Sequence, residues 1–378
     1  AHALDASAAA HLGDLGPAAT AVTAALSTAR QERAEAVALE TRHLEDERKR
    51  LTAILSEVPI ATVLINGNDQ IVLYDGQAAE ILSQISAPRL NAPMSDYVDR
   101  RAFDRAKAQM RSTGKSVEAG MATADRALTL TLTMTPLEAD CTLIFIDAAE
   151  ARIAPEAQRP LTYDFALLDR SSETGLEEAP LSRLDFCVFD LETTGLLPHK
   201  DAVVQIGALR VLRGRVVETE SFDTLVDPER PIPPVSTKVH GVTDAMVAGA
   251  PKIAEAGRAL HRFARDGVIV AHNAPFDLAF LRRHRRAMGV DWDMPVVDTV
   301  LVSAVLFGTT EPHDLDSLAA RLGVELAEAD RHTALGDARA TAQVLCRMLP
   351  MLEARGIDRF GRLVTEMRKH GRLIADQN

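Results

Sequence analysis

The spacing of apolar residues changes along the chain and divides it into segments. In residues 17–55, Val37, Leu44 and Leu51 recur at intervals of seven, and no Gly or Pro follows Pro17. This spacing predicts a long helix and favours a two-stranded coiled coil. Because several intervening seam positions are charged, a single solvated helix is the alternative.

From Ile60 onward the apolar spacing is that of short strands. Two β-type runs flank Asn66-Gly67-Asn68-Asp69, a strong hairpin-turn sequence. The expected elements are strands at Ala61–Ile65 and Gln70–Tyr74, helices near Ala78–Leu82 and Tyr97–Met110, and strands at Leu128–Thr135 and Thr142–Ile146. Together they predict a small α+β domain over residues 56–149. Residues 150–183, which contain three prolines, are expected to form a linker with a local anchor at Tyr163–Leu168.

Two apolar runs in the second half of the chain end in acidic sequences. Phe186–Phe189 leads into Asp190-Leu191-Glu192, and Gly267–Ala271 leads into a segment that ends at Asp277. Because side chains alternate across a strand, Asp190 and Glu192 point to the same face. Pro275 fits the first turn of a helix, and Asp277 then lies in that turn.

A third acidic sequence runs from His332 to Asp337 and opens an apolar helix. Five positions turn a regular helix by about 140° net of full turns, so the two residues would not share a helix face. Gly336 indicates that His332 lies on the entering loop and Asp337 in the helix, where they can converge. Carboxylates that share a face repel each other unless a cation lies between them, and such hard ligands suit Mg²⁺ or Mn²⁺. A solvated acidic pair at a strand end is the alternative for Asp190 and Glu192 alone.

Composition narrows the class of protein. The 378 residues carry a net charge of −12, of which residues 1–183 contribute −9 and residues 184–378 only −3. The three cysteines are far apart, which argues against a disulfide scaffold and a thiolate zinc site and favours a reducing compartment such as the cytoplasm. No apolar run approaches the roughly 18 residues of a membrane span. Since residue 1 is Ala, we expect a processed or truncated chain whose upstream part could carry a membrane anchor.

The acidic segments resemble the DEDDh family of 3′–5′ exonucleases, most closely the proofreading epsilon subunit of bacterial DNA polymerase III. The match covers about residues 184–350. The family motifs D-x-E-T-T-G, H-N-A-x-F-D and H-x-x-x-x-D stand at Asp190–Gly195, His272–Asp277 and His332–Asp337. Val239–Asp244 matches a family segment that lines the terminal-nucleotide pocket. Thr333 stands where the tyrosine subclass has Tyr, so the histidine subclass is indicated.

This resemblance implies an α/β, ribonuclease-H-like domain with a mixed sheet flanked by helices. It implies a two-ion Mg²⁺ or Mn²⁺ site held by Asp190, Glu192, Asp277 and Asp337, with His332 as the general base. The implied nucleotide pocket consists of Thr193, Thr194, Gly195, His240, Asn273 and Phe276. The implied substrate is a single-stranded or frayed DNA 3′ end, cleaved to nucleoside monophosphates. An RNA exonuclease is the alternative, and a catalytically silent signalling or scaffold protein is a further one.

The stretch from Ile54 to Leu82 resembles the opening of a PAS domain. This domain contains no histidine to ligate haem, and its single cysteine, Cys141, is not in a flavin-reactive motif, so neither cofactor is expected. The resemblance implies a dimerisation or relay module. A homodimer through the N-terminal helix and this domain is therefore expected.

The remaining expectations concern the exonuclease-like part and its ends. The expected elements are strands at Val203–Leu212 and Arg215–Val226 and helices at Ile253–Phe263, Pro275–Met288, Leu315–Leu322 and Thr333–Leu349, followed by a C-terminal helical extension over 351–378. The segment around His284 contains four arginines, which could follow a nucleic-acid backbone or form a solvated helix face. No clamp-binding motif is evident, so association with a polymerase has no support in the sequence.

Overall fold

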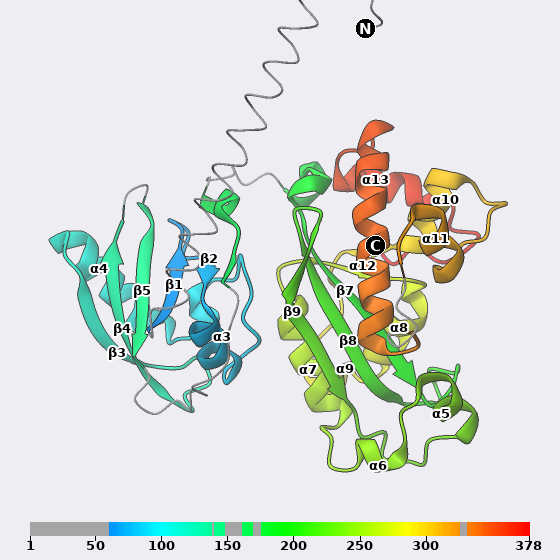
Figure 1. Ribbon diagram of the computed structural model, residues 1–378, viewed down its shortest axis with the longest axis horizontal. Helices are drawn as coiled ribbons and strands as arrows, with labels where there is room; N and C mark the ends of the chain where they lie inside the picture. Colours follow the sequence, from blue (N-terminus) through cyan, green and yellow to red (C-terminus); the bar gives the residue numbers. More distant parts are fainter. Residues whose placement is uncertain (1–59, 138–139, 148–160, 169–174, 326–330) are drawn as a thin grey trace, which may run out of the picture. The chain divides into compact units, whose positions relative to one another are not determined.

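The computed structural model describes residues 60–137, 140–147, 161–168, 175–325 and 331–378. The predicted N-terminal helical segment, residues 1–55 with its long helix over residues 17–55, lies outside these ranges. Residues 60–378 pack as one unit that contains two β-sheets (Figure 1). Within the described ranges, no helix combines the length and apolar character needed to cross a membrane.

The first sheet is antiparallel and six-stranded, in the order β3-β4-β5-β1-β2-β6. Its strands are β1 (Ala61–Ile65), β2 (Ile71–Tyr74), β3 (Val117–Ala122), β4 (Thr129–Pro136), β5 (Thr142–Asp147) and β6 (Thr162–Tyr163). Helices α3 (Gly76–Ser83) and α4 (Arg100–Thr113) belong to the same domain. Alternate residues of its strands form one apolar core with α3 and α4. We refer to this part as the N-terminal sheet domain.

The four strands and the first helix predicted here are confirmed. The predicted helix Tyr97–Met110 begins later, at Arg100, because the Asp99 carboxylate accepts a hydrogen bond from Ala102 N and caps the helix there. Strand β3 was not predicted. Strand β6 lies within the predicted linker and adds to β2, so this segment is part of the first sheet.

The second sheet is mixed and five-stranded, in the order β11-β10-β7-β8-β9. Its strands are β7 (Asp185–Thr193), β8 (Val203–Leu212), β9 (Arg215–Leu225), β10 (Val268–Ala271) and β11 (Val296–Asp298). Strands β10 and β11 run parallel to β7, whereas β8 and β9 form an antiparallel hairpin beside it. A mixed sheet flanked by helices is the architecture that the resemblance implied, and it is confirmed.

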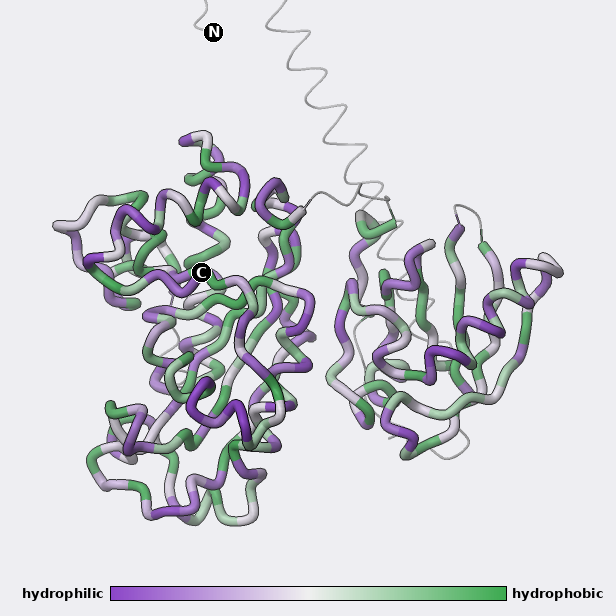
Figure 2. The backbone as a smooth tube through the Cα atoms, turned by 180° about the vertical axis from the view of Figure 1, so that it is seen from behind, coloured by the Kyte–Doolittle hydropathy of each residue, from purple (hydrophilic) through white to green (hydrophobic). Residues whose placement is uncertain are grey.

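Helices cover both faces of this sheet. Phe186 and Val188 of β7 pack toward α12 (Ala334–Ala354), while Cys187 and Phe189 pack toward α7 (Ile253–Ala264) and α8 (Ala274–Arg283). Figure 1 shows α12 lying across β7 and β8. Figure 2 shows hydrophobic and hydrophilic stretches alternating along the backbone of both sheets and of the helices around them. Asp190 and Glu192, in register with Phe186 and Val188, therefore face α12.

The other helices are α5 (Pro234–His240), α6 (Asp244–Val247), α9 (Arg285–Met288), α10 (Thr299–Phe307), α11 (Leu315–Leu322) and α13 (Phe360–Arg368). The predicted helix Pro275–Met288 is divided at His284 into α8 and α9. Helix α12 continues five residues beyond its predicted end, with Pro350 inside it. Helices α5, α6 and α10 and strand β11 were not predicted.

A buried charged cluster joins the N-terminal sheet domain to the second sheet. Arg210 of β8 lies 3.4 Å from Asp185 Oδ2 and 3.6 Å from Glu220 Oε2. The hydroxyl of Tyr74 donates to Glu220 Oε1 at 3.2 Å, and Asn91 Nδ2 donates to Asp185 Oδ2 at 2.7 Å. All three charged side chains are at least nine-tenths buried. Because bulk water does not reach these side chains, Asp185 and Glu220 receive hydrogen bonds from Asn91 and Tyr74 of the N-terminal sheet domain.

Further polar contacts lie around this cluster. Leu90 N donates to Glu220 Oε1, and the guanidinium of Arg89 donates to Arg265 O at 2.7 Å and to Asp96 Oδ2 at 2.8 Å. Burying charges costs free energy that their mutual attraction only partly offsets. This contact between the domains therefore needs each buried charge to keep its partner.

Candidate active site

The first two acidic residues lie at the end of β7. Asp190 pairs across the sheet with Gly207 and Glu192 with Gln205, both on β8. The apolar run Phe186–Phe189 buries the strand on both faces and fixes its register. Asp190 and Glu192 are partly exposed at the end of a buried strand, on the face toward α12.

The third acidic segment forms the turn into α12. Thr333 is the N-cap, and its hydroxyl accepts a hydrogen bond from Gly336 N at 3.1 Å. Asp337 lies in the first turn of the helix. His332 precedes the cap in a left-handed backbone conformation with φ of 57°, and its side chain is exposed. The predicted division between a loop histidine and a helical carboxylate is confirmed.

Three carboxylates from these two segments converge. One oxygen from each of Asp190, Glu192 and Asp337 lies within 4.8 Å of the others. Burial, followed by the charges of Asp277, Glu192 and Asp337, raises the pKa of Asp190 well above its usual range. Burial and the Asp337 charge raise the pKa of Glu192 to about 8. The ionised cluster is therefore unfavourable without a compensating cation.

Asp277 lies in the first turn of α8 and is 2% exposed. It is outside the group of three, but its charge is the largest electrostatic influence on Asp190 after burial. Burial also raises the pKa of Asp277 well above its usual range, although its own backbone amide and that of Leu191 act in the opposite direction. The four predicted carboxylates thus share one electrostatic environment.

This donor set fits a divalent cation. Carboxylate oxygens are the ligands preferred by Mg²⁺ and Mn²⁺, and neighbouring carboxylates with raised pKa values are stabilised as anions by such an ion. Among the described residues, one group of three or more His, Cys, Asp or Glu side chains is close enough to hold one metal ion. That group consists of Asp190, Glu192 and Asp337.

Asp298 was not predicted and supports the second acidic segment. It ends β11 beside β10, and its carboxylate accepts hydrogen bonds from Ala274 N at 2.8 Å, Asn273 N at 3.3 Å and Val300 N at 2.8 Å. It therefore holds the turn before α8 and also caps α10. The signal available in the sequence was an acidic residue after the apolar Val296-Val297, as at Asp190.

The predicted pocket residues of the first motif form a tight turn. Thr193 Oγ1 donates to Gly195 O at 2.8 Å, and Thr194 Oγ1 accepts from Ala202 N at 3.0 Å. Ser236 on α5 donates to Thr194 O at 2.8 Å. Both threonine hydroxyls thus shape the turn itself.

The other predicted pocket residues come from α5 and from the turn into α8. His240 is the last residue of α5, and its Nδ1 accepts from Val242 N at 3.0 Å. Burial lowers its pKa, and the backbone of Thr193 acts in the opposite direction, which places the ring beside the first motif. Asn273 is exposed with φ of 70°, and Phe276 packs edge-on against Phe280 at 5.2 Å.

The arginine-rich segment is partly occupied by contacts inside the domain. Arg283 Nη1 donates to Pro198 O at 2.6 Å and to Asp201 O at 3.0 Å, which braces the loop after β7. Arg282 Nε donates to Trp292 O at 3.4 Å. These two residues are structural ties. Arg285 and Arg286 are exposed, as is Arg283.

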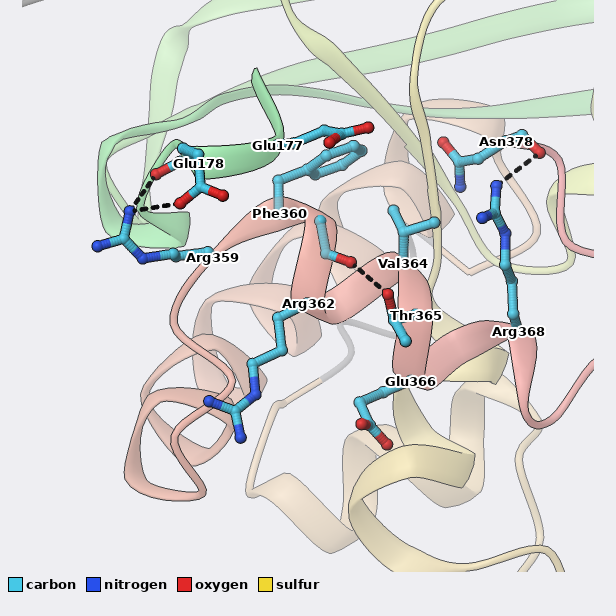
Figure 3. Close-up of a pocket in the computed structure, with 11 residues that line it drawn as sticks. Glu177, Glu178, Arg359, Phe360, Arg362, Val364, Thr365, Glu366, Arg368 and Asn378 are labelled. Carbon is cyan, nitrogen blue, oxygen red and sulfur yellow. Dashed lines mark hydrogen bonds and ion pairs between the residues drawn. The ribbon is translucent and has the colours of Figure 1, made fainter. Parts of the chain in front are cut away.

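A cavity of about 600 Å³ lies elsewhere, beside α13 (Figure 3). Its polar walls pair with one another, as Arg359 does with Glu178 and Arg368 with Asn378. Among its described lining residues there is none of the predicted site residues. The candidate chemistry is therefore at the carboxylate cluster and not in this cavity.

The part of the chain that carries this site is similar to known exonucleases. Residues 187–345 match the family model RNase_T, described as exonuclease. This part of the chain is therefore an exonuclease domain of the RNase T, DnaQ-like kind. More particularly, it is similar in sequence to a protein named for its likeness to the epsilon subunit of DNA polymerase III.

Two curated relatives illustrate the similarity. A DNA polymerase III subunit epsilon-like protein of Rhodobacter capsulatus is 58% identical over 221 residues, which are 58% of this chain and 31% of that protein. A DNA polymerase III PolC-type protein of Caldanaerobacter subterraneus is 38% identical over 184 residues, 49% of this chain and 13% of that protein. The chain thus spans less than a third of the length of these relatives.

Among solved structures, exonuclease X in complex with 5′ overhanging duplex DNA is 27% identical, with a TM-score of 0.35, and the match covers 45% of this chain and 93% of that one. Exonuclease I is 21% identical with a TM-score of 0.39, over 46% of this chain and 44% of that one.

Proposed function

We propose that the protein is a metal-dependent 3′–5′ exonuclease that releases nucleoside monophosphates from DNA 3′ ends. The observation that carries this proposal is the convergence of Asp190, Glu192 and Asp337, from β7 and α12, within 4.8 Å. Asp277, buried on α8, adds its charge to the same cluster. These are the four carboxylates of the DEDDh resemblance.

Each acidic residue has a role in this proposal. Asp190, Glu192, Asp277 and Asp337 would hold two Mg²⁺ or Mn²⁺ ions, because hard oxygen ligands select these metals. When bound, such a pair supplies activation of water and neutralisation of charge on the phosphate and leaving oxygen. The raised pKa values of Asp190 and Glu192 support this assignment. A bound cation would offset the repulsion between the carboxylates and so favour their ionised form.

His332 would be the general base, because it is exposed to solvent at the turn that leads into Asp337. An imidazole there can take a proton from an attacking water and pass it to bulk solvent. The turn of Thr193, Thr194 and Gly195 would position the terminal nucleotide. His240, Asn273 and Phe276 would complete its pocket.

DNA is proposed as the substrate because the most similar parts of the relatives belong to proteins named for DNA polymerase III. Exposed Arg285 and Arg286 could contact the phosphate backbone without sequence preference. A cytoplasmic location is part of this proposal, since that compartment holds nucleic-acid substrates. Association with a polymerase is not part of this proposal, since only the names of the relatives point to it.

For the N-terminal part we propose a PAS-like regulatory or dimerisation module. Its support is the sequence resemblance from Ile54 to Leu82 together with the antiparallel sheet and short helices of this domain. Homodimerisation through this domain and the preceding helix belongs to the same proposal, and light scattering of the full chain tests it. A monomeric mass would contradict it.

Degradation assays test the proposed reaction. The purified chain is incubated with 3′-labelled and 5′-labelled single-stranded DNA, frayed duplex DNA and RNA, with Mg²⁺, with Mn²⁺ or with chelator. We expect nucleoside monophosphates from DNA 3′ ends and no product with chelator. If RNA is degraded faster than DNA, the proposed substrate becomes RNA. Absence of product from every substrate would favour a silent binding protein.

A further inference from the structure

The first turn of α12 lies directly on β8. Asp190 pairs across the sheet with Gly207, and Glu192 pairs with Gln205. Paired residues of an antiparallel ladder project to the same face. Gly207 therefore occupies the position beside Asp190 on the face that α12 covers, where any other residue would project a side chain.

The space at Gly207 is filled by the backbone of α12. A Cβ atom on Gly207 would lie 2.1 Å from Leu335 N, 2.2 Å from the carbonyl carbon of Ala334 and 2.4 Å from Leu335 Cα. Rotation of a side chain cannot relieve contacts with backbone atoms, so either the helix or the strand would have to move. The φ angle of Gly207 is not positive, and close approach alone requires glycine here.

A shift of this turn would displace Asp337. Thr333 caps the helix, and Asp337 N donates to Thr333 O at 2.9 Å, so Ala334 to Asp337 form one hydrogen-bonded turn. Gln205 adds a second tie to β8, because its Oε1 accepts from Ala334 N at 3.4 Å. Clearing the Cβ contact requires a movement on the order of 1 Å, and misplacement by that distance costs active sites roughly 10²-fold.

We infer that Gly207, assisted by Gln205, is a positioning residue that sets the distance between Asp337 and the Asp190–Glu192 pair. The absence of a side chain at this one strand position lets the third acidic segment approach the first closely enough to share a cation. This inference rests on the proposed metal site.

The experiment compares Gly207→Ala with Gly257→Ala in the full chain. Gly257 on α7 is a matched control, because the three atoms nearest to a Cβ there all belong to the flexible side chain of Met288 and not to backbone. Mn²⁺ binding is titrated by calorimetry, and turnover on single-stranded DNA is measured against Mn²⁺ concentration. We expect Gly207→Ala to raise the half-saturating Mn²⁺ concentration at least about tenfold and to lower turnover by roughly 10²-fold. Gly257→Ala should leave both near wild type.

Wild-type Mn²⁺ binding and turnover in a folded Gly207→Ala protein would overturn the inference. An equal rise in half-saturation for Gly257→Ala would also overturn it, since the effect would then be one of general stability. If Gly207→Ala does not fold, Gln205→Ala decides: a severalfold rise in half-saturation supports the inference, and an unchanged value overturns it. A wild-type protein that binds no Mn²⁺ would instead refute the proposed metal site.

Discussion

At the scale of single residues, the carboxylate cluster carries an electrostatic cost in the metal-free protein. Asp190 is largely removed from solvent beside three other acidic side chains, and its raised pKa means that its ionised form is disfavoured in the folded state. A cation changes that cost into a source of stability, because it binds the folded cluster and not the unfolded chain. Metal binding and thermal stability should therefore change together.

The substitution Asp190→Asn tests this relation. It should raise the melting temperature of the metal-free protein, by about 2–4 °C per kcal/mol of relieved repulsion. It should also abolish both the rise in melting temperature caused by Mn²⁺ and the turnover. Calorimetric scans with Mn²⁺ or with chelator measure these effects, with exposed Asp291→Asn as the control. A Mn²⁺-dependent rise that persists in Asp190→Asn would contradict the assignment.

The substitution His332→Ala separates the base from the metal ligands. His332 is exposed and precedes the helix that carries Asp337, so its removal leaves all four carboxylates in place. Mn²⁺ affinity should stay near wild type, while turnover falls by roughly 10²–10⁴-fold, the usual effect of losing a general base. Single-turnover assays at saturating Mn²⁺ measure this. Loss of Mn²⁺ binding would instead make His332 a metal ligand.

At the scale of secondary-structure elements, Asp298 connects two helices to the sheet. Its buried carboxylate accepts from Ala274 N and Val300 N, so Asp298→Ala leaves buried amides without an acceptor. We expect a loss of about 2–3 kcal/mol in unfolding free energy and reduced turnover, because α8 carries Asp277. The control is Asp314→Ala, which removes the cap of α11 and should cost about 1 kcal/mol without loss of turnover. Equal effects of the two variants on turnover would contradict this role.

The elements differed in how well the sequence predicted them, for physical reasons. Strands β7 and β10 were predicted because each is a short apolar run that ends in an acidic motif. Strand β3 was not, because it contains Glu118 and Gly120 and buries only Val117 and Met121 among its six residues. Helix α10 is buried on nearly every side, so its run of apolar residues has no helical period to detect.

For the candidate site, the sequence predicted the carboxylates that converge but not the residues that support them. The motif residues stand in three short segments with recognisable spacing, and three of the four carboxylates converge as expected. The role of Gly207 depends on a helix that begins more than a hundred residues later, so no local pattern could reveal it. The same holds for the pairing of Arg283 with the loop after β7.

At the scale of the whole molecule, Glu220 links stability to pH. Burial raises the pKa of its carboxyl from the ordinary 4.5 to about 7, although Arg210 and the Leu90 amide act in the opposite direction. The folded protein thus holds this proton more tightly than the unfolded chain does. The resulting stability is fully present below about pH 4.5 and is lost as the pH rises toward 7.

The variant Glu220→Gln should remove this dependence. Between pH 5 and 7 its unfolding free energy should fall less steeply than that of the wild type, and at pH 8 it should be equal or higher, by roughly 1–3 kcal/mol. Denaturant titrations across this range measure the difference. Glu218→Gln, an exposed change on the same strand, is the control and should follow the wild type. Parallel pH profiles for all three proteins would contradict the buried titration.

The Leu90 amide donates a hydrogen bond to the Glu220 carboxylate, so the exchange of this one amide proton reports on the contact between the two domains. That amide belongs to the N-terminal sheet domain and its acceptor to β9, so hydrogen–deuterium exchange at this position requires the contact between the domains to open. Its exchange rate, compared with that of core amides such as those of β7, gives the free energy of separating the domains relative to that of global unfolding. If a signal received by the N-terminal domain reaches the nuclease through this contact, the exchange of a single amide would register it before any change in turnover is measured.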